Sequence, residues 1–203
     1  MTATNLGVNY KDAGRLKEGL ALLEQTYRSG ADIPTIRILA GPQLLDGYLQ
    51  SKKGKQAVKL TRELLVDATT YLPRNSPQLA SYFAQVGHLL LHSTEFAAAD
   101  RVLRQCLTIR QKTSPDSWLT FNTQSMLGGV LLKQGSYTSA EKLLVAGFEG
   151  MKKREAKIPA GSRVQLTAAI ERLVKLYAAM GNKNKAEEFR SLLKSRSSRQ
   201  PSK

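Results

Sequence analysis

Hydrophobic positions along this chain recur in a helical pattern that repeats several times. Each copy begins with a large apolar residue and carries a second one four positions later, the spacing of one face of an α-helix. A turn follows, then a small residue, and in three copies of five an apolar residue four positions beyond it. The copies cover 6–25, 86–105, 127–146, 173–192 and, more weakly, 44–63. The pattern predicts antiparallel helix pairs, each burying its apolar face against the next.

The small residue that opens the second helix of each pair sets the repeat length. It falls at Gly19, Ala57, Ala99, Ala140 and Ala186, in steps of 38, 42, 41 and 46 residues, a period of about 42. We therefore predict an all-α fold, a right-handed α-solenoid of about five antiparallel helix pairs. The array should cover 1–193, with repeats at about 1–29, 34–70, 76–112, 116–154 and 162–193.

Glycine and proline mark the ends of the expected helices. Gly14, Gly135 and Gly181 lie where the first helix of a pair should end in a left-handed cap. Gly41 and Pro42 interrupt the first helix of the second repeat, and an interior proline costs about 3 kcal/mol. We expect a kink near residue 41, or a helix that begins at Pro42.

These positions resemble the tetratricopeptide repeat, and the spacing is similar to the longer repeats of kinesin light chains rather than to the form of about 34 residues. A closer resemblance is to the C-terminal repeat arrays of planctomycete serine/threonine protein kinases. The stretches that carry it are 22–30, 72–91, 101–112 and, above all, 118–159. The resemblance implies a tetratricopeptide-repeat superhelix that scaffolds or recruits for a kinase.

The chain itself lacks the kinase signatures. It has no glycine-rich loop, no His-Arg-Asp catalytic loop and no Asp-Phe-Gly. We therefore expect no enzymatic activity, and a kinase supplied in cis by missing sequence or in trans by another chain. The first repeat is short, with about a dozen residues before Leu16. The chain is thus expected to be the terminal portion of a longer array.

The charge of the chain introduces an alternative. Its 203 residues carry 31 Lys+Arg and 16 Asp+Glu, a formal net charge of +15. Residues 1–103 hold 12 basic and 9 acidic side chains, whereas residues 104–203 hold 19 and 7. A basic half favours acidic partners, so the alternative function is an adaptor for RNA or an anionic surface. The tail 194–203 has no apolar residue and is predicted to be a disordered basic tail.

Cysteine usage and hydropathy exclude other classes. One cysteine, Cys106, cannot make a disulfide scaffold or a four-ligand zinc module, and we expect it to be a buried structural thiol. No stretch approaches the roughly 18 consecutive apolar residues of a membrane span, and no secretory signal is recognisable. The expected location is cytoplasmic.

Candidate binding residues follow from the repeat frame, because the first helix of each pair should expose one stripe to the inner groove. These candidate partner-binding residues are Asp46, Gln50, Ser81, His88, His92, Asn122, Ser125, Lys133, Glu171 and Lys175. No catalytic, cofactor-binding or metal-binding set is predicted, and no cofactor is expected.

Two narrower functions are weighed against this groove. His88 and His92 have the i, i+4 spacing of metal ligands, but zinc needs a further ligand and Glu95 falls in a turn. Contact with a partner is a better interpretation than metal binding, and the remaining alternative is that both histidines are simply solvated. The Lys/Asn clamp of chaperone-tail-binding repeats cannot be assembled, since its places in the first repeats hold Thr4, Asn5 and Val8. The sequence therefore predicts a non-catalytic scaffold that holds a peptide or helix of a protein partner of unknown identity.

Overall fold

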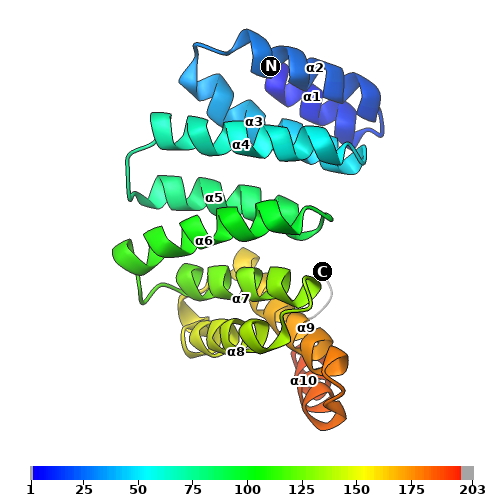
Figure 1. Ribbon diagram of the computed structural model, residues 1–203, viewed down its shortest axis with the longest axis vertical. Coiled ribbons are helices and arrows are strands. Elements are labelled where there is room, and N and C mark those ends of the chain that lie inside the picture. Colours follow the sequence, from blue (N-terminus) through cyan, green and yellow to red (C-terminus); the bar gives the residue numbers. More distant parts are fainter. Residues whose placement is uncertain (1, 198–203) are drawn as a thin grey trace. The chain divides into compact units, whose positions relative to one another are not determined.

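The computed structural model of the protein describes residues 2–197, which form ten α-helices, two short 3-10 helices and no strand. The α-helices are α1 (Ala3–Asp12), α2 (Leu16–Ser29), α3 (Pro34–Gln50), α4 (Gly54–Tyr71), α5 (Pro77–Leu91), α6 (Phe96–Thr113), α7 (Trp118–Lys133), α8 (Tyr137–Lys153), α9 (Val164–Ala179) and α10 (Lys183–Ser197). The 3-10 helices η1 (Glu155–Lys157) and η2 (Ala160–Ser162) lie between α8 and α9. α1 and α2, α3 and α4, α7 and α8, and α9 and α10 each form an antiparallel pair (Figure 1). The all-α fold class is confirmed.

In three pairs the first helix ends in a left-handed glycine cap, as predicted. Gly14, Gly135 and Gly181 have φ of 79°, 77° and 72°. At Gly135 the capping bonds are those of a Schellman motif: its N–H donates to Leu132 O at 3.0 Å, and the next N–H donates to Leu131 O at 2.9 Å. Lys52 takes this place in the second pair with φ of 55°, a left-handed conformation that a lysine rarely adopts.

Small residues open the second helices where the two helices of a pair cross. Gly19, Ala57, Ala99, Ala140 and Ala186 are all buried. A Cβ atom at Gly19 would lie 2.6 Å from Gly7 O, so this crossing requires a glycine. The close approach explains why the repeat is marked by residue size as well as by hydrophobicity.

The chain divides into two compact units, residues up to Val102 and residues from Leu103. In the first unit, α1 to α4 pack as two pairs around Leu23, Leu45 and Leu64, none of which is exposed. A buried polar network ties α2, α3 and α4 together. Arg37 donates two hydrogen bonds to the Asp67 carboxylate, at 2.9 and 3.0 Å, and the Tyr27 hydroxyl donates a third at 2.8 Å. The fully paired carboxylate fixes these three helices relative to one another.

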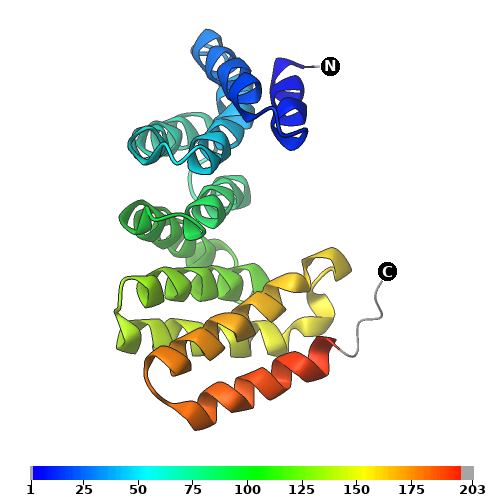
Figure 2. The ribbon, with the colours of Figure 1, turned by 90° about the vertical axis from the view of Figure 1, so that its right-hand side faces the viewer.

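The second unit holds α7 to α10 and the end of α6. Figure 2 shows α9 lying against the α7–α8 pair, with α10 on its other side. Cys106 is fully buried, as predicted, with its Sγ 3.7 Å from Thr123 Oγ1. Arg110 is also buried and donates to Leu119 O and Thr123 Oγ1 at 2.8 and 2.6 Å. These bonds fix the end of α6 on α7.

The structure differs from two local expectations, one at Pro42 and one at the start of the C-terminal tail. α3 is continuous from Pro34 to Gln50 and contains Pro42, so the expectation of a helix beginning at Pro42 is wrong. Pro34 at the first helical turn starts the helix instead, where its missing N–H costs nothing. α10 continues through Ser197, so the first four residues of the predicted tail are helical, and 198–203 lie outside the described residues.

Candidate partner-binding surfaces

The two candidates on α3 take part in contacts within the first unit. Asp46 is half-buried and forms an ion pair with the buried Lys11 of α1, a residue that the sequence pattern missed. Its Oδ2 also accepts a hydrogen bond from Gln50 Nε2 at 2.8 Å. Asp46 therefore joins α1 to α3, and Gln50 is the more exposed of the two.

The three candidates on and after α5 are exposed. Ser81 and His88 lie on the helix and His92 is its C-cap residue. The two imidazole rings lie edge to face with centroids 5.2 Å apart. Within residues 2–197, no group of three or more His, Cys, Asp or Glu side chains is placed to hold a metal ion.

One candidate on α7, Ser125, contacts an arginine of α9 that the sequence analysis did not single out. Arg172 of α9 is half-buried and donates from Nη1 to Ser125 Oγ of α7 at 3.0 Å. Ser125 is fully buried, and Asn122 one turn earlier is 7% exposed with an Oδ1 that accepts no hydrogen bond. Lys133, Glu171 and Lys175 are exposed.

Lys133, Arg172 and Lys175 form a set of like charges, called here the α7–α9 cation cluster. Burial lowers the pKa of Lys133, and the positive charges of Lys175 and Arg172 lower it further. Burial also lowers the pKa of Arg172 to about 10, and only partial compensation comes from the neighbouring Glu171 carboxylate. Burial and the neighbouring positive charges thus both act against the charged form of Lys133, and burial acts against that of Arg172.

Arg172 was missed because the two candidates chosen on α9 are spaced four residues apart. Glu171 and Lys175 satisfy that spacing, whereas Arg172 and Lys175 are three apart and equally share a face. A basic residue among the apolar positions of a predicted helix was the signal that could have found it.

A pocket of about 670 Å³ lies between α1 and α3 in the first unit. Its lining has no charged side chain: Thr2, Ala3, Thr4, Asn5, Val8, Asn9, Thr26, Thr35, Ile36, Leu39 and Gln43. Leu39, which lines this pocket, is 67% exposed. This lining includes Thr4, Asn5 and Val8, the residues that stand in place of the Lys/Asn clamp of chaperone-tail-binding repeats. The pocket is called here the α1–α3 pocket.

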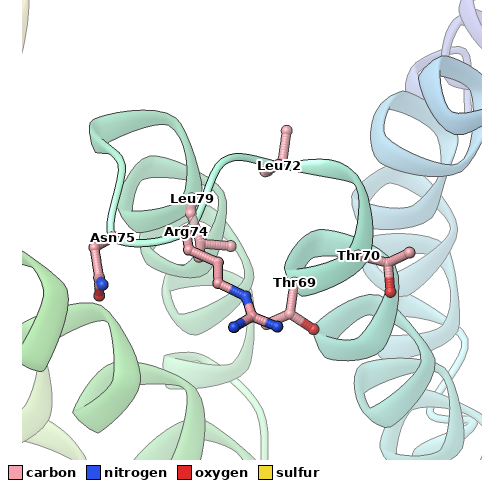
Figure 3. A pocket seen from close by; sticks show the side chains of 6 residues that line it. All are labelled: Thr69, Thr70, Leu72, Arg74, Asn75 and Leu79. Carbon is pink, nitrogen blue, oxygen red and sulfur yellow. The ribbon is translucent and has the colours of Figure 1, made fainter.

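Two further hollows belong to the first unit. One of about 730 Å³ follows the loop from α4 to α5, where the Arg74 guanidinium lies near Thr69 and Asn75 points away (Figure 3). The other, of about 320 Å³, lies beside Tyr27, Tyr48 and Arg37. Arg37 is already paired with Asp67, and Arg74 belongs to an exposed connection, so neither hollow offers a built site.

None of the helices in the described residues has both the length and the apolar character needed to cross a bilayer. Comparison with protein-family models finds no match. Comparison with curated proteins also finds none.

Solved structures, in contrast, match nearly the whole chain. A kinesin light chain-like protein of Podosopora anserina with nearly identical TPR-like repeats is 19% identical, with a TM-score of 0.73 over 98% of this chain and 96% of that one. MamA (AMB-1) is 19% identical with a TM-score of 0.53, covering 94% of this chain and 99% of its own. BtubC (BKLC) from P. vanneervenii is 16% identical with a TM-score of 0.51, covering 100% and 94%. The chain therefore has the tetratricopeptide-like repeat fold, and the predicted likeness to kinesin light chain repeats is confirmed.

Proposed function

We propose that this chain is a non-catalytic scaffold that binds an extended segment of a protein partner against the first helices of its pairs. The observation that carries the proposal is the α1–α3 pocket. Its volume of about 670 Å³ falls in the range of natural ligand sites, which is about 300–1,000 Å³. It lies between two first helices, the surfaces that a repeat fold leaves free after pairing.

The chemistry of the α1–α3 pocket favours an uncharged peptide. Val8, Ile36 and Leu39 supply apolar surface for side chains of the partner. The amides of Asn5 and Gln43 can both donate to and accept from a peptide backbone. A charged side chain would lose hydration here without gaining an opposite charge, so the pocket disfavours it.

Two buried side chains of types that can act in catalysis, a thiol and a carboxylate, have structural roles in this chain. Burial raises the pKa of the Cys106 thiol, which keeps it protonated and unreactive at neutral pH. The Asp67 carboxylate is fully engaged by Arg37 and Tyr27. Neither group is available as a nucleophile or base.

The exposed residues that the sequence analysis named as candidates are proposed as further contacts with the partner. Ser81, His88 and His92 offer an exposed contact surface on α5, and Lys133 and Lys175 offer one in the second unit. The resemblance of 118–159 to planctomycete kinase repeats supports an interaction region of a serine/threonine kinase system, cytoplasmic, with the kinase in cis or in trans.

A second candidate function is the basic adaptor. The excess of 19 basic over 7 acidic residues in 104–203 favours it. Binding of that kind falls steeply with salt, because each neutralised phosphate releases counterions. Titration of labelled RNA at two salt concentrations separates the candidates, since peptide binding in an uncharged pocket changes little with salt.

The proposed function is tested by selecting peptides from a random phage-displayed library on the immobilised protein. We expect enrichment of uncharged, partly apolar sequences. L39D places a charge in the α1–α3 pocket and should abolish their binding. V66D is the matched control, because Val66 is 63% exposed on α4 and outside the pocket lining. Absence of enrichment, or equal loss with L39D and V66D, would contradict the proposal.

A further inference from the structure

The connection between α8 and α9 carries a dense set of exposed basic side chains. Residues 149–163 hold five basic and two acidic residues. Lys152 and Lys153 lie in the last turn of α8, and Lys157 lies in η1. Arg163 directly precedes α9. These four side chains are all exposed, and the surface that they form is called here the basic connection.

The backbone of the basic connection is fixed to the second unit. Ile158 is 2% exposed and belongs to the hydrophobic core of this unit. Arg154 donates from Nε to Asp116 O at 2.7 Å and from Nη1 to Gly150 O at 3.0 Å. The Lys157 N–H donates to Arg154 O at 2.8 Å and closes a tight turn. The exposed cations therefore stand on ordered backbone, which need not be ordered again when a partner binds.

The carboxylates that contact this connection are already paired. Glu155 Oε1 lies 2.8 Å from Arg196 Nη1 of α10. Figure 2 shows the connection, in yellow, on the same side of the unit as the end of α10, in red. Asp116 forms an ion pair with Arg154, which lowers the pKa of Asp116, and the charge of Lys157 lowers it further. Neither carboxylate is left to neutralise the exposed cations.

The basic connection therefore keeps an unbalanced positive charge. In the described part of the chain, none of its four exposed cations forms an ion pair. Glu149, the other carboxylate of 149–163, is exposed on α8 and precedes Lys152 and Lys153 by about one turn. It can offset one of the four charges, which leaves an excess of three. Exposed charges of one sign favour a partner of the opposite sign and speed its association.

We propose that the basic connection binds an acidic segment, rich in Asp and Glu, of the protein partner. The cations are spread over the end of a helix and the connection that follows it, so they match carboxylates spaced along an extended chain. Lysine ammonium groups on flexible stems accept a carboxylate without fixing its orientation. The inference rests on the proposed function, because it assumes a protein partner, but its surface lies in the other unit.

Two other polyanions fit this surface less well. Single-stranded RNA is held by stacking of its bases on aromatic side chains as well as by charge, and residues 149–163 contain no aromatic residue. Basic segments that bind a bilayer also insert large apolar side chains into it. Met151 and Ile158, the large apolar residues of 149–163, are both buried.

The test measures binding of the whole chain to a fluorescein-labelled peptide in which glutamates alternate with serines. Binding is followed by fluorescence anisotropy at about 0.05 M and about 0.15 M salt, and a peptide with glutamine in place of each glutamate is the control. We expect the glutamate peptide to bind at least about tenfold more tightly than the glutamine peptide at the lower salt. Its affinity should fall at the higher salt, because screening weakens exposed ion pairs.

Two triple variants identify the surface. K152Q/K153Q/K157Q should weaken the glutamate peptide about tenfold at the lower salt, because each exposed ion pair contributes little and three together contribute about this much. The matched control is K17Q/K55Q/K59Q, which removes three exposed lysines of the first unit and should leave the affinity nearly unchanged. L39D should not affect this peptide, so failure of the α1–α3 pocket and failure of the basic connection are distinguishable.

Equal affinity for the two peptides would overturn the proposal, because carboxylates would then not be recognised. Equal weakening by the two triple variants would also overturn it, since the total charge of the chain would then be responsible. Binding of a labelled uridine oligonucleotide or of phosphatidylserine vesicles that only K152Q/K153Q/K157Q abolishes, without binding of the glutamate peptide, would assign the surface to those partners instead.

Discussion

Replacing Lys52 by glycine should stabilise the protein, although it removes a side chain. Lys52 occupies the position that glycine holds at the ends of α1, α7 and α9, with φ of 55°. Its N–H donates to Leu49 O at 3.1 Å, and the following N–H donates to Tyr48 O at 2.8 Å. The hydrogen bonds of the cap come from the backbone, so K52G keeps them and removes only the strain of a left-handed lysine.

The magnitude follows from two opposing terms. A residue with a Cβ atom in the left-handed region costs roughly 1–2 kcal/mol. Glycine costs about 0.5–1 kcal/mol more conformational entropy on folding than alanine. K52G should therefore raise the free energy of unfolding by about 0.5–1 kcal/mol. G135A should lower it by about 1 kcal/mol, because a Cβ at Gly135 meets no atom within 4 Å and adds only backbone strain.

The assay is urea denaturation followed by circular dichroism, with each variant compared to the parent chain. The two units are allowed separate transitions, since repeat arrays need not unfold all at once. K59G is the control, because it places a glycine at an exposed position inside α4 and should cost about 1 kcal/mol. A neutral or destabilising K52G, together with a tolerated G135A, would refute the assignment of this turn to the repeat frame.

Three further outcomes are expected. G147A should lower the free energy of unfolding by about 1–3 kcal/mol, because the added Cβ would lie 2.7 Å from both Phe121 O and Ser125 N. An unchanged urea midpoint of unfolding would contradict the close crossing of α7 and α8. R37M should cost about 3 kcal/mol by leaving the buried Asp67 carboxylate without its cation, whereas a neutral effect would show that this carboxylate is not desolvated. Burial raises the pKa of Tyr48 to about 12, so the free energy of unfolding should fall as the pH rises from 10 through about 12. Tyrosinate absorbance measures this titration, and titration of all tyrosines near pH 10 would contradict the prediction.

The repeat frame could be predicted because it depends on local and periodic signals. The apolar i, i+4 pairs, the small residues at helix crossings and the capping glycines each act within about forty residues of chain. The expectation that a helix begins at Pro42 was wrong for the opposite reason, because the effect of this proline is not local. Its cost is set by how well α3 packs on both sides, and Leu44 and Leu45 bury that helix whether or not one backbone bond is lost.

The candidate surface was only partly accessible to sequence reasoning. The stripe included Ser125 and Lys175 but missed Arg172, whose role depends on how α7 and α9 pack across 47 residues of sequence. It also included Asp46 without its partner Lys11, 35 residues away. The α1–α3 pocket has no charged residue to mark it, so only the assembled helices reveal it.

The central claim, that the α1–α3 pocket holds a segment of a protein partner, is tested most directly by site-specific photocrosslinking in the source cells. A benzophenone amino acid is placed at Leu39 in one variant and at Val66 in the other, both exposed positions of the first unit. The account predicts that Leu39 crosslinks reproducibly to one segment of one protein and that Val66 does not. Identical products from both positions, or none from Leu39, would contradict it.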